Sequence, residues 1–264
     1  MNILANLIEE ARHNLAVHEG NLRIDNIIIG KTLYTMKGCG KVFTDMNFCL
    51  VLLENSYGFS YFQEEIDYSL GRFVNKNALD VVAEAIPIYM KVAITDAMYC
   101  LINGKEFINM PTFSGDIRQK AKERARILLA HIPKGSRVLL LGAATEIIEE
   151  AIARSCDLKV VDLEQQKIGL EFQSALIEGN NEKDLKDRIK EADYVVATGM
   201  IFVSETADDI FRLTIGNGKK LVIYMETGSN FGQQLIGCGA DIVLSEFFPF
   251  YDFFGETKYM LFKK

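Results

Sequence analysis

The sequence has few of the residues on which nucleophilic or metal chemistry is usually built. It holds three histidines in 264 residues and contains neither a G-x-S-x-G turn nor a C-x-x-C pair. A serine-type triad and a preformed zinc site therefore have little support. The cysteines are odd in number and scattered, which favours reduced thiols in the cytoplasm. They are Cys39, Cys49, Cys100, Cys156 and Cys238.

Long apolar runs and positive charge are also lacking. No run approaches the roughly 20 apolar residues that span a bilayer, so no membrane insertion is expected. Glu9 and Glu10 interrupt the opening segment where a signal peptide would still be apolar. The net charge of −7 opposes binding to nucleic acid or an anionic membrane. With 49% hydrophobic and 25% charged residues, the composition is typical of a soluble globular protein, and 264 residues can bury a substantial core.

The pattern of elements changes near residue 112. Before it, a helix from residue 2 to about 17 precedes strand-like runs at 24–29, 33–36 and 42–43, and then helices at 78–86 and 88–101. After it, helices at 116–132, 145–154, 205–215 and 229–237 alternate with strands at 137–141, 158–162, 193–198, 220–225 and 241–244, and a last strand at 258–262 pairs antiparallel at an edge. Such alternation indicates a parallel sheet. We therefore predict an α/β protein with a small α+β domain at 1–112 and a Rossmann-like domain at 113–264.

Residues 137–164 form the most informative stretch. An apolar strand leads into Gly142, a helix follows from Thr145, and the next strand ends at Asp162, where a ribose-binding acid sits in a βαβ nucleotide site. The helix, however, opens with Glu146, Glu149 and Glu150, and their carboxylates repel phosphate. These carboxylates repel a ligand without phosphate, such as a methionine-derived cofactor or a metal-bound small acid, less strongly. The alternative is a turn that binds nothing.

Further candidates follow the other strand ends, because ligands of open α/β sheets bind outside the carboxyl ends of the strands. Hydroxyls and glycines offer hydrogen bonds and close backbone approach, and the acids suit amines, hydroxyls or cations. The alternative is that the hydroxyls only cap helices and turns. The predicted ligand-binding residues are Gly142, Ala144, Thr145, Asp162, Glu164, Thr198, Gly199, Thr206, Glu226, Thr227, Gly228 and Ser229.

Two residues are candidate metal ligands, and one segment is a candidate surface. Cys39 lies between two glycines in a tight turn, and Glu226 follows a strand. Both are candidates for a transition metal, although most lone cysteines are buried apolar residues. The segment FFPFYDFF at 247–254 is the densest aromatic cluster. It is either core or interdomain packing, a wall over an interdomain cleft, or a dimer surface.

Several segments resemble a known family. SRVLLLGAATEI, KVVDLE, EADYVVATGMIFVSET and KLVIYMETGSNFGQQLIGCGADIVLSEFF resemble the Rossmann-like domain of the heavy-metal chelation family. KTLYTMKGCGKVF and VAITDAMYCLIN resemble its enolase-N-terminal-like domain. The resemblance implies cytoplasmic handling of a heavy metal or metal-bound small molecule in an interdomain cleft. Ala143 stands where relatives often carry histidine, and Asp96 where asparagine is common.

Two other hypotheses stay open. One is an enzyme that uses S-adenosylmethionine or a nucleotide, with Asp162 or Glu164 holding the ribose hydroxyls of a ligand at the Gly142 turn. The other is a non-catalytic subunit that docks a partner through the aromatic segment. The expected partner is a small molecule or metal complex, and a homodimer is a further hypothesis. No residue pair has the spacing that would identify a general acid and base.

Overall fold

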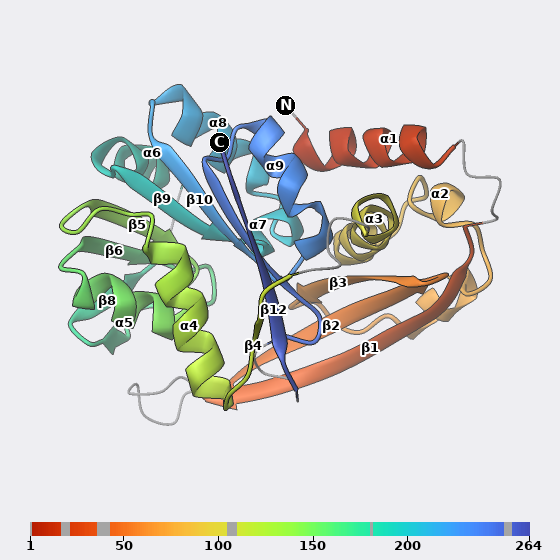
Figure 1. Cartoon of the computed structure of the whole chain (residues 1–264), viewed down its shortest axis with the longest axis horizontal. Coiled ribbons are helices and arrows are strands. Elements are labelled where there is room, and N and C mark those ends of the chain that lie inside the picture. The colour runs from red at the N-terminus through yellow and green to blue at the C-terminus, as the bar shows by residue number, and fades with distance from the viewer. Residues whose placement is uncertain (1, 17–21, 36–42, 105–109, 180–181, 251–254) are drawn as a thin grey trace.

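The computed structural model describes residues 2–16, 22–35, 43–104, 110–179, 182–250 and 255–264. Two parts lie side by side, a small sheet with its helices and a larger sheet between helices (Figure 1). The first part comprises α1 (Ile3–Leu15), β1 (Ile24–Thr35), β2 (Phe43–Leu53), β3 (Ser56–Phe62), the 3-10 turn η1 (Tyr68–Phe73), α2 (Ala78–Val81) and α3 (Ile88–Asn103).

The elements of the second part alternate along the chain. They are β4 (Thr112–Phe113), α4 (Ile117–Leu129), β5 (Arg137–Leu141), α5 (Thr145–Ala153), β6 (Asp157–Val161), β7 (Glu171–Phe172), β8 (Ala175–Glu178), α6 (Glu182–Glu191), β9 (Tyr194–Thr198), α7 (Met200–Val203), α8 (Ala207–Gly216), β10 (Lys220–Met225), η2 (Ser229–Phe231), α9 (Gly232–Cys238), β11 (Ile242–Phe247) and β12 (Thr257–Lys263).

The small sheet is an antiparallel meander in the order β1-β2-β3. The runs expected at 24–29 and 33–36 belong, as far as they are described, to the single strand β1, which continues through Gly30 and is described to Thr35; of the run expected at 42–43, only Phe43, the first residue of β2, is described. A Cβ at Gly30 would lie 2.4 Å from the Phe48 ring, so the glycine makes room for that ring. On the face of β3 that meets α3, a Cβ at Gly58 would lie 1.9 Å from the Ala93 carbonyl oxygen. Glycine therefore lets strand and helix backbones touch.

The large sheet has the order β4-β12-β11-β10-β9-β5-β6-β8-β7. The pairs from β11 through β8 are parallel, and β12, β4 and β7 add antiparallel edges. Helices α4 and α5 pack on one face in a core of their own, and α6, α8 and α9 pack on the other. This confirms the predicted class, an α/β protein with a Rossmann-like parallel sheet and a smaller α+β part. The last strand is antiparallel as expected, but β4 lies beyond it.

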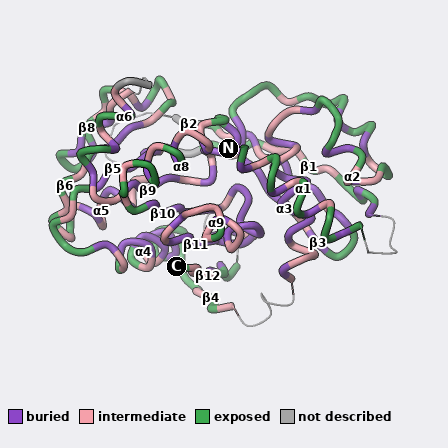
Figure 2. The backbone as a smooth tube through the Cα atoms, turned by 90° about the horizontal axis from the view of Figure 1, so that it is seen from above, coloured by how far each residue is buried: buried purple, intermediate pink, exposed green. Residues whose placement is uncertain are grey.

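One hydrophobic core joins the two parts. It contains residues of α1 and α3 together with residues of β9, β10 and α8, and buried residues, purple in Figure 2, occur in both halves. The predicted boundary between residues 112 and 113 falls inside β4, which pairs with β12. The division into two domains stays a prediction. No helix among the described residues has both the length and the apolar character needed to cross a bilayer.

Candidate functional site

The Gly142 turn lies at the carboxyl edge of the large sheet. Gly142 has φ +101°, and its N–H donates to the Val161 carbonyl at 2.8 Å. A Cβ on Gly142 would lie 3.2 Å from the Thr198 methyl group, so the ends of β5 and β9 are in contact here. Ala144 occupies the N-cap position of α5 and supplies no side-chain cap. The first N–H groups of that helix therefore rely on partners other than a capping side chain.

Asp162 holds this turn in place. Its Oδ2 accepts the Ala143 N–H at 2.8 Å, and its Oδ1 accepts the Glu164 N–H at 2.9 Å. Lys167 pairs with Asp162 at 3.5 Å and with Glu164 at 2.7 Å. The carboxylates of Asp162 and Glu164 thus already have partners within this loop, and the hydroxyls of a ribose at Asp162 would compete with those donors. This geometry fits a nucleotide or S-adenosylmethionine ribose poorly at Asp162.

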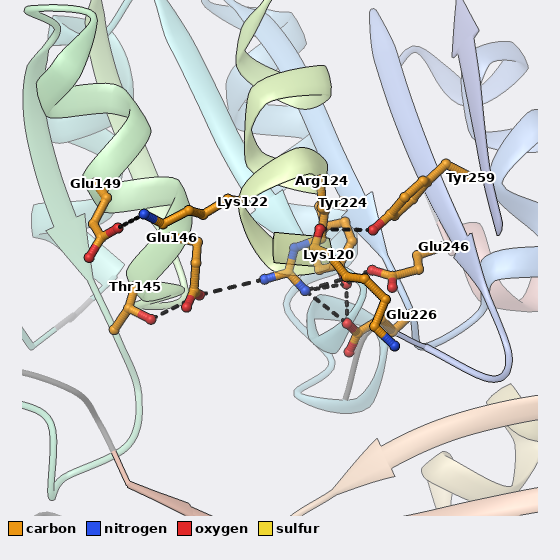
Figure 3. Close-up of polar contacts among 10 residues, drawn as sticks. All are labelled: Lys120, Lys122, Arg124, Thr145, Glu146, Glu149, Tyr224, Glu226, Glu246 and Tyr259. Carbon is orange, nitrogen blue, oxygen red and sulfur yellow. Dashed lines mark hydrogen bonds and ion pairs between the residues drawn. The ribbon is translucent and has the colours of Figure 1, made fainter. Parts of the chain in front are cut away.

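A buried arginine organises the neighbouring strand end. Asp116 and Gln119 form a capping box that starts α4 at the carboxyl edge, and this places Arg124 two turns on, against the sheet. Arg124 Nη1 donates to the Tyr224 hydroxyl at 2.8 Å and to Glu226 Oε1 at 3.0 Å (Figure 3). Its Nη2 lies 3.9 Å from Glu146 Oε2 at the start of α5. The guanidinium also stacks 4.5 Å from the Tyr224 ring centroid, a cation–π contact.

Glu246, on β11, completes the network and is fully buried. Its Oε2 lies 2.8 Å from the Tyr224 hydroxyl and 3.7 Å from Arg124 Nη1, and its Oε1 accepts the Thr257 hydroxyl at 2.6 Å. The Tyr224 hydroxyl also hydrogen-bonds to Glu226 Oε1. On β12, burial raises the pKa of the Tyr259 hydroxyl. Two carboxylates, a phenol and a guanidinium therefore share one largely dry site.

The loop after β10 serves the junction between the two parts. Thr227 Oγ1 accepts the Tyr61 N–H at 3.0 Å, and the Gly228 N–H donates to the Phe59 carbonyl at 3.1 Å. A Cβ at Gly199 would lie 2.3 Å from the Thr227 carbonyl oxygen, so Gly199 packs on the same loop. Thr227 and Ser229 are both buried. Ligand binding by Gly199 and by residues 227–229 stays a prediction.

Asp96 fastens that loop to α3. Its carboxylate accepts the Phe59 N–H at 2.9 Å, the Asn230 N–H at 2.7 Å and the Asn230 side-chain amide at 3.0 Å. Complete burial raises the pKa of Asp96 to about 8, against the opposing effect of these three donors. Asp96 is thus a structural acid between the two sheets.

The remaining predicted residues do not join one cluster. Thr206 precedes α8, where its hydroxyl lies 2.9 Å from that of Ser204. Cys39 lies outside the described residues. Among the described residues, no group of three or more His, Cys, Asp or Glu, at Glu226 or elsewhere, is arranged for a metal ion. The side chains around Glu226 therefore fit a transition metal poorly.

The aromatic segment packs inside the molecule where it is described. The Phe250 ring is fully buried, and its centroid lies 4.6 Å from that of Phe59. Phe248 stacks on Phe59 at 5.9 Å. These contacts place residues 247–250 between the small sheet and the carboxyl edge of the large one. Partner docking by this segment stays a prediction.

Two depressions lie between α6 and the large sheet, and none of the predicted site residues lines either of them. One, of about 180 Å³, includes Arg137, Asp157 and Lys159 in its lining. The other, of about 350 Å³, includes Lys159 and Arg188. Their cations are paired, Arg137 with Asp193 at 2.5 Å, Lys159 with Glu191 at 2.6 Å and Arg188 with Glu178 at 2.7 Å. They therefore serve as a comparison site for the tests below.

No protein-family model and no curated protein matches the chain. A solved protein of unknown function from the DUF364 family of Desulfitobacterium hafniense is similar in structure, with a TM-score of 0.63 and 12% identity over 98% of this chain and 99% of that one. A second DUF364 family protein of unknown function, from Pyrococcus horikoshii, has a TM-score of 0.57 and 11% identity over 99% and 100%. At these identities the likeness shows the fold alone.

These matches correct the family suggested by the sequence motifs. The two structures named above are described as DUF364 family proteins of unknown function, and the comparisons show no heavy-metal chelation family. The assignment to that family is therefore wrong. The short motifs that carried it are strand ends and glycine turns, which any sheet of this topology needs.

Proposed function

We propose that this protein binds a small organic molecule that carries an amine or neighbouring hydroxyl groups, over the Gly142 turn. The observation that carries the proposal is Arg124, which is only 2% exposed and holds Glu226 and Glu146 from two different elements. A buried cation is costly and is tolerated only with several good partners. Besides Tyr224 and the buried Glu246, its partners are two partly exposed carboxylates, Glu146 and Glu226, and their exposure suits ligand binding better than core packing alone.

The chemistry of the edge indicates the ligand class. Carboxylates at Glu146 and Glu226 attract amines and accept from hydroxyls, whereas they repel phosphate. The hydroxyl of Thr145 donates to Glu146 at 2.9 Å and so extends the polar rim. Gly142 takes φ +101°, which holds the turn close against Thr198 beside this rim. An amine or a diol therefore matches this site better than a phosphorylated molecule.

S-adenosylmethionine belongs to this ligand class, since it carries an amine, a sulfonium cation and ribose hydroxyls. Under this proposal its cationic part faces Glu226, and its ribose does not depend on Asp162. We further propose a cytoplasmic location, supported by the free thiols Cys49, Cys100, Cys156 and Cys238. A homodimer stays a prediction.

The proposal is tested by titrating amide-labelled protein with S-adenosylmethionine, adenosine and spermidine while following the amide signals of the edge residues by NMR. We expect a cationic probe to shift Gly142 and Glu226. We also expect Glu226→Gln to weaken binding about tenfold or more, or about 1.4 kcal/mol. Glu149→Gln is the matched control, because Glu149 pairs with Lys122 at the rim at 3.9 Å. Signals that stay fixed with every probe, or that move only at Arg137 and Lys159, would contradict the proposal.

A further inference from the structure

The Tyr224 hydroxyl has more acid partners than it has hydrogens. It hydrogen-bonds to Glu226 Oε1 and lies 2.8 Å from Glu246 Oε2, while Arg124 Nη1 donates to the same oxygen at 2.8 Å. A phenol carries one hydrogen and donates to one acceptor at a time. The second oxygen–oxygen contact needs a proton of its own. Because Tyr224 has none to spare, that proton belongs to one of the two carboxyl groups.

We propose that Glu246, Tyr224 and Glu226 form a proton relay in which Glu246 holds a proton at rest and Glu226 delivers one to the bound ligand. Glu246 is fully buried, and burial disfavours its charged form. Arg124 Nη1 lies 3.0 Å from Glu226 but 3.7 Å from Glu246, so it favours the charged form of Glu226 more strongly. The resting proton therefore sits on Glu246.

The other groups around the relay fit this arrangement. Two cations approach from α4: Arg124, and Lys120, whose Nζ donates to the Gly255 carbonyl at 3.1 Å. From α5 comes the carboxylate of Glu146, and from β12 come the neutral hydroxyls of Thr257 and Tyr259. Among the described residues, three glutamates lie within 4 Å of the Arg124 guanidinium, and a proton on one of them lowers the repulsion between their carboxyl groups.

The transfer balances atom by atom. The Glu246 proton passes to the Tyr224 oxygen while the Tyr224 hydrogen passes to Glu226 Oε1, and Glu226 gives its proton to a basic atom of the ligand. Glu246 is left as a carboxylate 3.7 Å from Arg124, and the ligand gains the positive charge. Glu226 is then the catalytic residue, and Tyr224 and Glu246 are positioning residues. The delivery to a ligand rests on the proposed function, whereas the stored proton does not.

The stored proton is tested on ligand-free protein labelled with ¹³C at the glutamate side-chain carboxyl carbon. The carbon of a protonated carboxyl group has a different chemical shift from that of a carboxylate. Because only glutamate is labelled, the buried acid Asp96 gives no signal. At pH 7 we expect one glutamate signal at the protonated position. Glu246→Gln removes it, and Glu149→Gln, the matched rim control, leaves it in place. Glu226→Gln makes the same signal titrate at lower pH, because its like-charged neighbour is gone while Arg124 remains.

The wild-type spectrum alone is decisive even if a variant fails to fold. Glutamate signals that all resonate as carboxylates at pH 7 would overturn the relay, as would a protonated signal that survives Glu246→Gln unchanged. Because no ligand is present, that result leaves the ligand site intact. The converse outcome is a spectrum that shows the stored proton while no probe shifts the Gly142 amide signal. That result would overturn the ligand site and the delivery step but would support the stored proton.

Discussion

Replacing Asp96 with asparagine should change how stability depends on pH. Burial raises the pKa of Asp96 to about 8 from its ordinary value of 3.8. Between these values the folded protein keeps a proton that the unfolded chain releases. The stability that Asp96 contributes is therefore complete below about pH 4 and is lost as pH rises to about 8. Each pH unit in that window costs the wild type about 1.4 kcal/mol, or about 4 kcal/mol between pH 4 and 7.

Asp96→Asn cannot ionise, so the difference in unfolding free energy between variant and wild type should move in favour of the variant by about 1.4 kcal/mol per pH unit. The new amide also faces the donors of Phe59 and Asn230, which adds a cost that is independent of pH. The test therefore depends on how the difference in unfolding free energy changes with pH, and not on its absolute value. Urea unfolding at several pH values between 4.5 and 7.5 measures it.

Asp193→Asn is the matched control. Hydrogen bonding to Arg137 holds the pKa of Asp193 at about 2, so its stabilising effect is present above the unfolded value and is lost only as pH falls toward 2. The difference in unfolding free energy between Asp193→Asn and the wild type should not change from pH 4.5 to 7.5. A flat difference for Asp96→Asn as well would refute the argument that burial outweighs the three donors to that carboxylate.

Two further substitutions test the packing of the site. Arg124→Met should cost about 3–5 kcal/mol in urea unfolding, because it leaves buried glutamates without their cation; Arg126→Met, at an exposed pair with Glu123, should cost no more than about 0.5. Gly142→Ala should cost about 1–3 kcal/mol, since φ +101° strains any side chain. Gly216→Ala, with open space around it, should be neutral or stabilising.

Each of these two substitutions has a contradicting outcome. An Arg124→Met protein as stable as the wild type would mean that the glutamates need no buried cation. A Gly142→Ala protein as stable as Gly216→Ala would mean that the turn relaxes without cost.

The parallel sheet is predictable because its strands have a clear signal in the sequence. Runs such as 137–141 and 220–225 are apolar on both faces, as doubly covered strands must be, and glycine or acid follows each one. The β2–β3 hairpin was missed because its turn lacks the usual glycine signal: Glu54 takes φ +54° there. The helix expected at 205–215 starts at Ala207 after the short helix α7.

The Arg124 network was not predictable from spacing. Lys120 and Arg124 lie four apart beside an apolar stripe, a pattern that surface helices share, and Ile117 of that stripe is in fact exposed. Glu246 follows the apolar run 242–244 after Ser245, so an acid at the end of a buried strand is the available signal. Only the tertiary pairing of β10 with β11 brings Glu226 and Glu246 to one hydroxyl.

Native mass spectrometry of the purified wild type, Glu226→Gln and Glu149→Gln tests the central claim most directly. The account predicts that wild type and Glu149→Gln retain an organic molecule with an amine or a diol, and that Glu226→Gln loses it. A molecule that Glu226→Gln retains equally well would contradict a ligand site at Glu226. A wild-type protein that retains no molecule, and whose Gly142 amide signal is not shifted by S-adenosylmethionine, adenosine or spermidine, would also contradict it.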